Sequence, residues 1–173
     1  IEQGLREIPG IYRVAIRRVW PGTLRISIVE SEGMAEWLPN DRDGLPAGEQ
    51  WLNLPPGSAI SFIPKLSGPS AKRSTILDVY LEGMDKLWPL GLEISAVDLS
   101  HSGDWTFKIR SAQLEQFEFM LIVGRHEPLA KLADFADVYQ IDLSQRSSSI
   151  ASIDLRYPSG LAVRWNSVTS KLS

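Results

Sequence analysis

Short runs in which apolar and polar residues alternate recur along this chain, and turn-forming residues separate them. A period of two is typical of a strand with one face in the core, because successive side chains point to opposite sides of the sheet. Longer stretches with the period of an amphipathic helix are few. The pattern therefore predicts an α+β fold dominated by sheet. The predicted strands cover residues 12–16, 24–28, 34–38, 51–54, 60–63, 93–99, 105–109, 116–123, 153–157 and 161–165.

Three helices are predicted, a short one at 1–8 and two longer ones at 74–88 and 128–139. Thr75, followed three residues later by Asp78, resembles a capping box, and Pro128 suits a first helical turn. The first long helix should bury Leu77, Tyr80, Leu81, Met84 and Leu87, and the second Leu129, Leu132, Phe135, Ala136 and Tyr139. Residues 144–149 read as a polar connector, and residues 166–173 as a loose tail.

The last two predicted strands form a hairpin whose register can be proposed from the side chains. A three-residue loop, 158–160, pairs 157 with 161, 155 with 163 and 153 with 165. All the apolar side chains then fall on one face, with Asp154 opposite Arg164 on the other. A two-residue loop would place apolar residues opposite polar ones. The prediction is therefore a three-residue turn with Tyr157 and Trp165 on the apolar face.

Charge is unevenly distributed along the 173 residues. Residues 1–30 carry a net charge of +2 and the remainder −5, which indicates a domain boundary near residue 31. The net charge of −3 argues against a general nucleic-acid binder. Arg13, Arg17 and Arg25 should share one face of the first hairpin. That face is either a solvated sheet surface or a contact for anionic lipid headgroups.

Common catalytic chemistry finds little support in this composition. There is no Cys, and His101 and His126 are the only two histidines. Phosphate-binding glycine loops, the Ser-x-x-Lys and Gly-x-Ser-x-Gly motifs, and the two-histidine zinc helix are absent from the sequence. We therefore predict a protein with no catalytic residues, no cofactor and no metal site.

Five segments, taken in order, resemble the FtsQ/DivIB family of bacterial cell-division proteins. They are residues 18–30 (RVWPGTLRISIVE), 34–37 (MAEW), 64–69 (PKLSGP), 123–125 (VGR) and 153–165 (IDLRYPSGLAVRW). Residues 18–30 resemble the closing hairpin of a POTRA domain. The resemblance implies that residues 1–31 are the C-terminal part of a POTRA domain, a helix plus a β-hairpin. Residues 32–165 would form a larger mixed or antiparallel sheet domain with two helices.

The resemblance also implies a role and a location. The expected protein is a non-enzymatic divisome scaffold that recruits FtsB and FtsL to the division septum and helps to regulate septal peptidoglycan synthesis. It would lie on the periplasmic side of the cell inner membrane, anchored by one upstream helix, and this chain would be a fragment of it. The alternative is a POTRA-containing module for polypeptide transport or outer-membrane assembly. A peptidoglycan-active enzyme is a more distant third.

In the family, FtsB adds a strand beside the last strand of the sheet domain. An unpaired edge strand is a template for such pairing, and Tyr and Arg are frequent interface anchors. Tyr157 has a second interpretation, in which it closes the core with Trp165. Carrying the family's motifs onto this sequence gives the expected partner-binding residues Arg125, Arg156, Tyr157, Ser159, Gly160, Leu161, Val163 and Trp165.

Overall fold

The computed structural model describes residues 11–19, 22–30, 34–40, 50–54, 62–112, 117–158 and 160–166. The predicted helix at 1–8, the tail after residue 166 and Ser159 lie outside these ranges. The strands are β1 (Ile11–Val19), β2 (Thr23–Glu30), β3 (Met34–Pro39), β4 (Gln50–Asn53), β5 (Lys65–Gly68), β6 (Leu92–Leu99), β7 (Trp105–Ser111), β8 (Glu118–Gly124), β9 (Ile150–Asp154) and β10 (Ala162–Trp165). The main helices are α2 (Arg73–Leu87) and α3 (Pro128–Val138).

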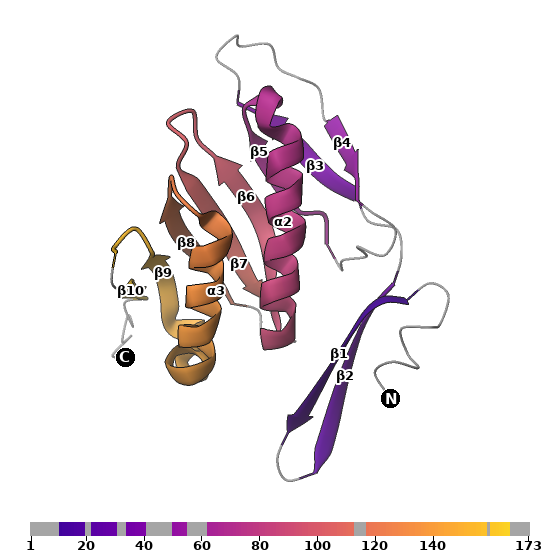
Figure 1. Ribbon diagram of the computed structural model, residues 1–173. Coiled ribbons are helices and arrows are strands. Elements are labelled where there is room, and N and C mark those ends of the chain that lie inside the picture. The colour runs from indigo at the N-terminus through magenta and orange to yellow at the C-terminus, as the bar shows by residue number, and fades with distance from the viewer. Residues whose placement is uncertain are drawn as a thin grey trace, which may run out of the picture.

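The strands form two separate sheets (Figure 1). β1 and β2 pair with each other as the predicted antiparallel hairpin, and the register places Arg17 opposite Arg25. The other strands form an eight-stranded sheet in the order β10-β9-β8-β7-β6-β5-β3-β4. Three neighbouring pairs are parallel (β3 with β5, β5 with β6, β8 with β9), and the other four are antiparallel. The predicted α+β class, with a mixed sheet and two long helices, is therefore confirmed.

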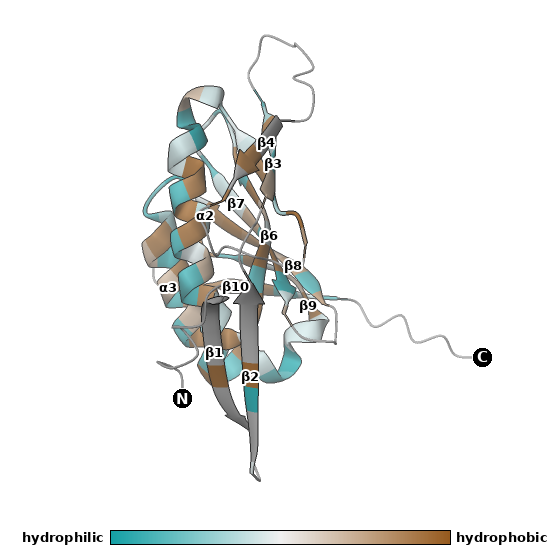
Figure 2. Cartoon of the chain, turned by 90° about the vertical axis from the view of Figure 1, so that its right-hand side faces the viewer, coloured by the Kyte–Doolittle hydropathy of each residue, from teal (hydrophilic) through white to brown (hydrophobic). Residues whose placement is uncertain are grey.

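Both long helices are crossover connections between parallel strands. α2 joins β5 to β6, and α3 joins β8 to β9 through a π-helical turn, η3 (Tyr139–Leu143), and a 3-10 segment, η4 (Ser144–Ser149). Parallel neighbours require such long connections, because the chain must return to the same end of the sheet. Figure 2 shows α2 and α3 on the same side of the sheet. The opposite face carries ion pairs such as Lys65–Glu36 and Lys108–Glu118.

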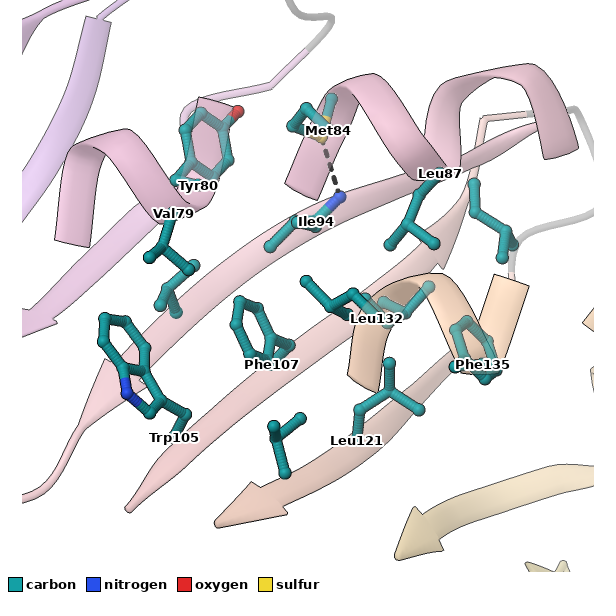
Figure 3. Packing of buried hydrophobic residues seen from close by; sticks show 14 of the residues in the cluster. Val79, Tyr80, Met84, Leu87, Ile94, Trp105, Phe107, Leu121, Leu132 and Phe135 are labelled. Atoms are coloured by element: carbon teal, nitrogen blue, oxygen red, sulfur yellow. Dashed lines mark hydrogen bonds between the residues drawn. The ribbon is translucent and has the colours of Figure 1, made fainter. Parts of the chain in front are cut away.

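The hydrophobic core lies between this helical layer and the sheet (Figure 3). Phe107 of β7 and Leu132 of α3 are fully buried, and the aromatic ring of Phe135 contacts those of Phe119 and Tyr139. α2 approaches closely because residue 83 is glycine: a Cβ there would lie 2.8 Å from Ile94 Cδ1. The α3 prediction holds, with Leu132, Phe135 and Tyr139 buried and Leu129 and Ala136 packed against the core.

The prediction for α2 needs two corrections. Its buried side chains include Ile76 and Val79, whereas Leu77 and Leu81 are only partly buried at the edge of the contact. The capping box is wrong, because Lys72 occupies the N-cap position and no side chain caps the helix. A 3-10 turn, η1 (Ser70–Lys72), leads directly into α2 and moves the start of the helical segment before Thr75.

One strand was missed and another was misplaced. β5 is only four residues long, lies between two prolines, and exposes Lys65 while burying Leu66. The prediction put a strand at 60–63 instead, but residues 62 and 63 are not in a strand, and 60 and 61 lie outside the described residues. A strand buried on one face for so few residues carries too little periodicity to be recognised.

The register of the last hairpin is also wrong. Val163 pairs with Ile153 and Ala162 with Asp154, so Arg164 lies opposite Ser152 and not Asp154. β9 already ends at Asp154, and the bend and turn at Tyr157 and Pro158 lie beyond it. The connection between β9 and β10 is therefore longer than three residues. The slip is two residues, so Ile153 and Val163 keep their predicted face, whereas a register shift before Trp165 breaks the alternation at the end of β10.

Candidate functional site

β10 is the edge strand of the large sheet, and within the described ranges β9 is its single neighbour. An edge strand presents alternate backbone N–H and C=O groups on its open side. We use the name edge surface for β10 together with Arg125, Arg156, Tyr157 and Gly160. These residues come from the ends of β8 and β9 and from the connection to β10. The edge surface thus combines a backbone template with side chains from three places in the sequence.

Arg156 is held by the carboxylate at the end of β9. Its Nε donates to Asp154 Oδ1 at 2.9 Å, its Nη2 donates to Oδ2 at 2.6 Å, and its backbone N–H donates to Oδ1 at 3.0 Å. The guanidinium hydrogen bonds lower the pKa of Asp154 and raise that of Arg156. The Arg156 side chain remains 60% exposed, so the fixed guanidinium faces solvent.

Gly124 makes room for this arginine. Its φ of +83° lies in the left-handed region that favours glycine, and a Cβ there would come within 3.0 Å of Arg156 Cγ. The Gly-Arg pair after β8 therefore has a structural reason in this chain: glycine lets the stem of Arg156 lie across the turn, and Arg125 follows on the exposed side.

Arg125 forms an ion pair with Asp104, with Nε 3.4 Å from Oδ1. The Ser102 hydroxyl donates to the same carboxylate, and this hydrogen bond and the nearby arginines lower the pKa of Asp104. The turn between β6 and β7 thus orients Arg125 much as Asp154 orients Arg156. Asp104 and Ser102 were not predicted as site residues, because their proximity to Arg125 depends on the pairing of β7 with β8.

Tyr157 projects from the connection between β9 and β10, and 57% of its surface is exposed. The interpretation that it closes the core is therefore wrong. Trp165 is 38% exposed, and the guanidinium of Arg146 lies 4.8 Å from its ring centroid. Leu161 and Val163 are partly buried against the core, as half-buried strand residues are. Gly160 is exposed, with an extended φ of +151° that glycine adopts readily.

A groove of about 500 Å³ separates the edge surface from α3. Tyr157, Pro158, Gly160 and Leu161 form one wall, and the other is lined by Glu127, Ala130, Lys131, Asp134 and Val138. The α3 wall was not predicted. The α3 residues that line the groove are spaced three or four positions apart, and residues with this spacing lie on one face of a helix. The sequence therefore contains a signal for that face. The sequence does not show that this face lies opposite Tyr157 and Leu161, because that position depends on the tertiary fold.

The Arg156–Asp154 pair gives a pH-dependent prediction. Asp154 titrates below the ordinary aspartate pKa of about 3.9 in the folded protein, so it stabilises the fold above that pH, and the contribution is lost as the pH falls through the lowered value. Replacing Arg156 with Met should raise the pKa of Asp154 towards the ordinary value, as measured by carboxyl ¹³C NMR titration. Arg164→Met is the control and should leave it unchanged. An Asp154 that titrates normally in the wild-type protein would contradict this geometry.

In the part of the chain that the structure describes, no helix combines the length and the hydrophobicity needed to span a membrane. No cluster of three or more His, Asp or Glu side chains is arranged to hold a metal ion within the same ranges.

Comparison with known proteins yields one family. A family model described as "Cell division protein FtsQ/DivIB, C-terminal" matches residues 39–156, which include β8 and β9 and end at Arg156. The cell division protein FtsQ of Shewanella oneidensis is 28% identical over 99% of this chain and 62% of its own length. FtsQ of Allochromatium vinosum is 30% identical over 95% of this chain and 62% of its own length. FtsQ of Escherichia coli is 27% identical over 92% of this chain and 56% of its own length.

The chain thus spans less than two thirds of the length of each of these relatives. The match of the family model covers more than half of the chain, from the end of β3 to the start of the edge surface. The fold agrees with the α+β architecture that the sequence resemblance implied. This chain belongs to the FtsQ/DivIB family of cell division proteins.

Proposed function

We propose that this chain is the docking part of a non-enzymatic divisome scaffold, and that its edge surface binds FtsB by strand addition to β10. FtsL would be recruited together with FtsB, and the complex would help to regulate septal peptidoglycan synthesis. The observation that carries the proposal is the position of β10 at the sheet edge with Tyr157 exposed beside it. Family membership favours this role over the transport-module alternative.

Strand addition requires both backbone and side-chain contributions. Each ladder hydrogen bond contributes about 1 kcal/mol net, so a short added strand is weak and unselective on its own. Tyr157 offers an exposed aromatic ring at one end of β10, and Trp165 a partly exposed one at the other. Arg125 and Arg156, held in place by Asp104 and Asp154, offer exposed guanidinium donors for carboxylate or carbonyl oxygens of the partner. The side chains of the edge surface would therefore select among partner strands that the backbone alone would bind equally well.

The proposal extends to the location of the full-length protein. A scaffold with this role would be anchored in the inner membrane by a single helix before residue 1, with its folded part in the periplasm at the division septum. Residues 1–31 would complete a POTRA domain, of which β1 and β2 are the described hairpin. The Arg17–Arg25 face of that hairpin stays open to either interpretation, a solvated surface or a lipid contact.

Backbone methylation of a synthetic FtsB peptide tests strand addition without altering this protein. In an added strand, the N–H groups of every second residue face the neighbouring strand, and those of the residues between them face away. N-methylation of the first set removes the hydrogen bonds to β10, whereas N-methylation of the second set spares them. We call these the sensitive phase and the insensitive phase. Loss of three such hydrogen bonds, at about 1 kcal/mol each, should weaken binding by about 100-fold or more in the sensitive phase.

Calorimetric titration of the two methylated peptides and the unmodified peptide measures this difference. The peptide methylated in the insensitive phase is the matched control, because it carries the same number of methyl groups. Equal affinity of the two methylated peptides would show that the partner does not bind as an added strand.

A further inference from the structure

The β8–β9 ladder ends where the edge surface begins. The two strands run parallel, with Ile122 paired to Asp154, and the Leu155 N–H donates to the Ile122 carbonyl at 2.8 Å. Past this point the chain from β8 turns at Gly124 into Arg125, and the chain from β9 continues into Arg156. Something other than strand pairing must therefore hold these two segments beside each other.

Lys131 of α3 occupies this position. Its Nζ donates to the Leu155 carbonyl at 2.8 Å and to the Val123 carbonyl at 3.2 Å. Leu155 and Val123 are both buried, so neither carbonyl has ready access to water. An ammonium group carries three donors, and two of them bridge the ends of neighbouring strands here. The single cation thus replaces the next step of the ladder.

The helix is built so that Lys131 can reach both strand ends. Its backbone N–H donates to the Glu127 carbonyl at 3.1 Å, in the first turn of α3 after Pro128. Leu132, the next residue, and Phe135, one turn further along the same helix, are fully buried and fix α3 in the core. Lys131 therefore extends from a rigid support, with its half-buried side chain along the groove beside Tyr157.

We propose that Lys131 is a positioning residue for partner binding. By joining the carbonyls of Val123 and Leu155, it sets the separation of the Arg125 and Arg156 segments and the direction in which Tyr157 leaves the sheet. It acts through the edge surface and does not have to touch the partner. The effect on binding rests on the proposed function, whereas the effect on local structure does not.

A purely structural role is the competing interpretation. Loss of a general stabilising contact would loosen the whole domain, whereas loss of a local clamp would loosen the ends of β8 and β9 and leave β6 and β7 unchanged. Amide hydrogen exchange separates the two, because it reports opening residue by residue. Measured on the free protein, it gives an answer that does not depend on any partner.

Lys131→Met is the main test, since it keeps most of the aliphatic stem and removes all donors. Amide exchange at Leu155 and Arg156, whose N–H groups donate to the Ile122 carbonyl and the Asp154 carboxylate, should rise by about tenfold, with no change in β6 and β7. The affinity for the unmodified FtsB peptide should fall by about tenfold as well. Lys131→Arg retains donors and charge, so its amide exchange and its affinity for the peptide should both stay close to those of the wild-type protein.

Two further variants complete the design. Lys86→Met removes the same charge from an exposed position on α2 and should change neither property. Lys131→Gln, a milder change that keeps a donor, should give intermediate values if the Met variant is too unstable to measure. Exchange that rises uniformly through the domain, or that does not change at Leu155 and Arg156, would overturn the positioning role. A wild-type protein that fails to bind the peptide would contradict the proposed function, while the exchange result would still decide the role of Lys131.

Discussion

Replacing Phe107 with Ala is expected to lower the free energy of unfolding by about 3–5 kcal/mol. Phe107 lies in β7 near the centre of the sheet, is fully buried, and stacks on Trp105 with ring centroids 6.2 Å apart. Figure 3 shows its ring among the buried side chains that lie between the strands and the two helices. The substitution therefore loses the transfer energy of the ring and leaves a cavity.

Urea unfolding followed by circular dichroism measures this change. Typical domains are stable by only about 5–15 kcal/mol, so a loss of this size should lower the urea midpoint clearly. Thr106→Ala, one residue earlier on the opposite face of β7, is the matched control and should change stability by about 0.5 kcal/mol or less. A loss below about 1.5 kcal/mol for the Phe107 variant would show that the sheet and helices do not pack as described.

Replacing Tyr157 with Ala should weaken binding of the FtsB peptide by about 30-fold, which corresponds to about 2 kcal/mol. Tyr157 stands at the start of the open edge, more than half exposed, and lines the groove with Leu161. A partner strand along β10 would cover this ring and exclude water from it. Because the free protein does not bury the ring, the melting temperature should change little.

Calorimetric titration and thermal melting together test the role of Tyr157. Tyr157→Phe should retain most of the affinity if the ring, and not the hydroxyl, makes the contact. Ile141→Ala removes an 86% exposed apolar side chain from η3, outside the edge surface, and should leave binding unchanged. Unchanged affinity for the Ala variant with a normal circular dichroism spectrum would remove Tyr157 from the binding site.

Much of the fold could be predicted from the sequence, because most strands of the sheet are buried on one face. Alternation and turn residues locate β1, β2, β3, β4, β6, β7 and β8 to within a few residues. β5 has one buried leucine between two prolines, which is too little pattern for any method based on periodicity. Its position is decided by neighbours on both sides, β3 and β6, which are distant in the sequence.

The candidate site was predicted in part. Motif resemblance indicated Arg125, Arg156 and Tyr157, and the structure places all three at one end of β10. The register of the hairpin was missed because side-chain matching extended β9 to Tyr157. β9 ends at Asp154, whose carboxylate accepts from the backbone N–H and the guanidinium of Arg156. Lys131 was missed for a different reason. A lysine on an exposed helical face looks solvated until the ends of β8 and β9 are known to lie beneath it.

β10, the strand proposed to bind the partner, is itself only loosely joined to the sheet. β10 pairs with β9 over four residue pairs and has a bulge before Trp165, whereas β6 and β7 pair over seven. A protein that binds solely to β10 can be held no more durably than β10 is held by β9, since fraying of this short strand would release both together. The lifetime of such a complex would then be limited by opening within this chain as well as by the contacts between the two proteins. Side chains anchored elsewhere, such as Arg125 after β8, would lengthen it by keeping the partner attached while β10 re-forms.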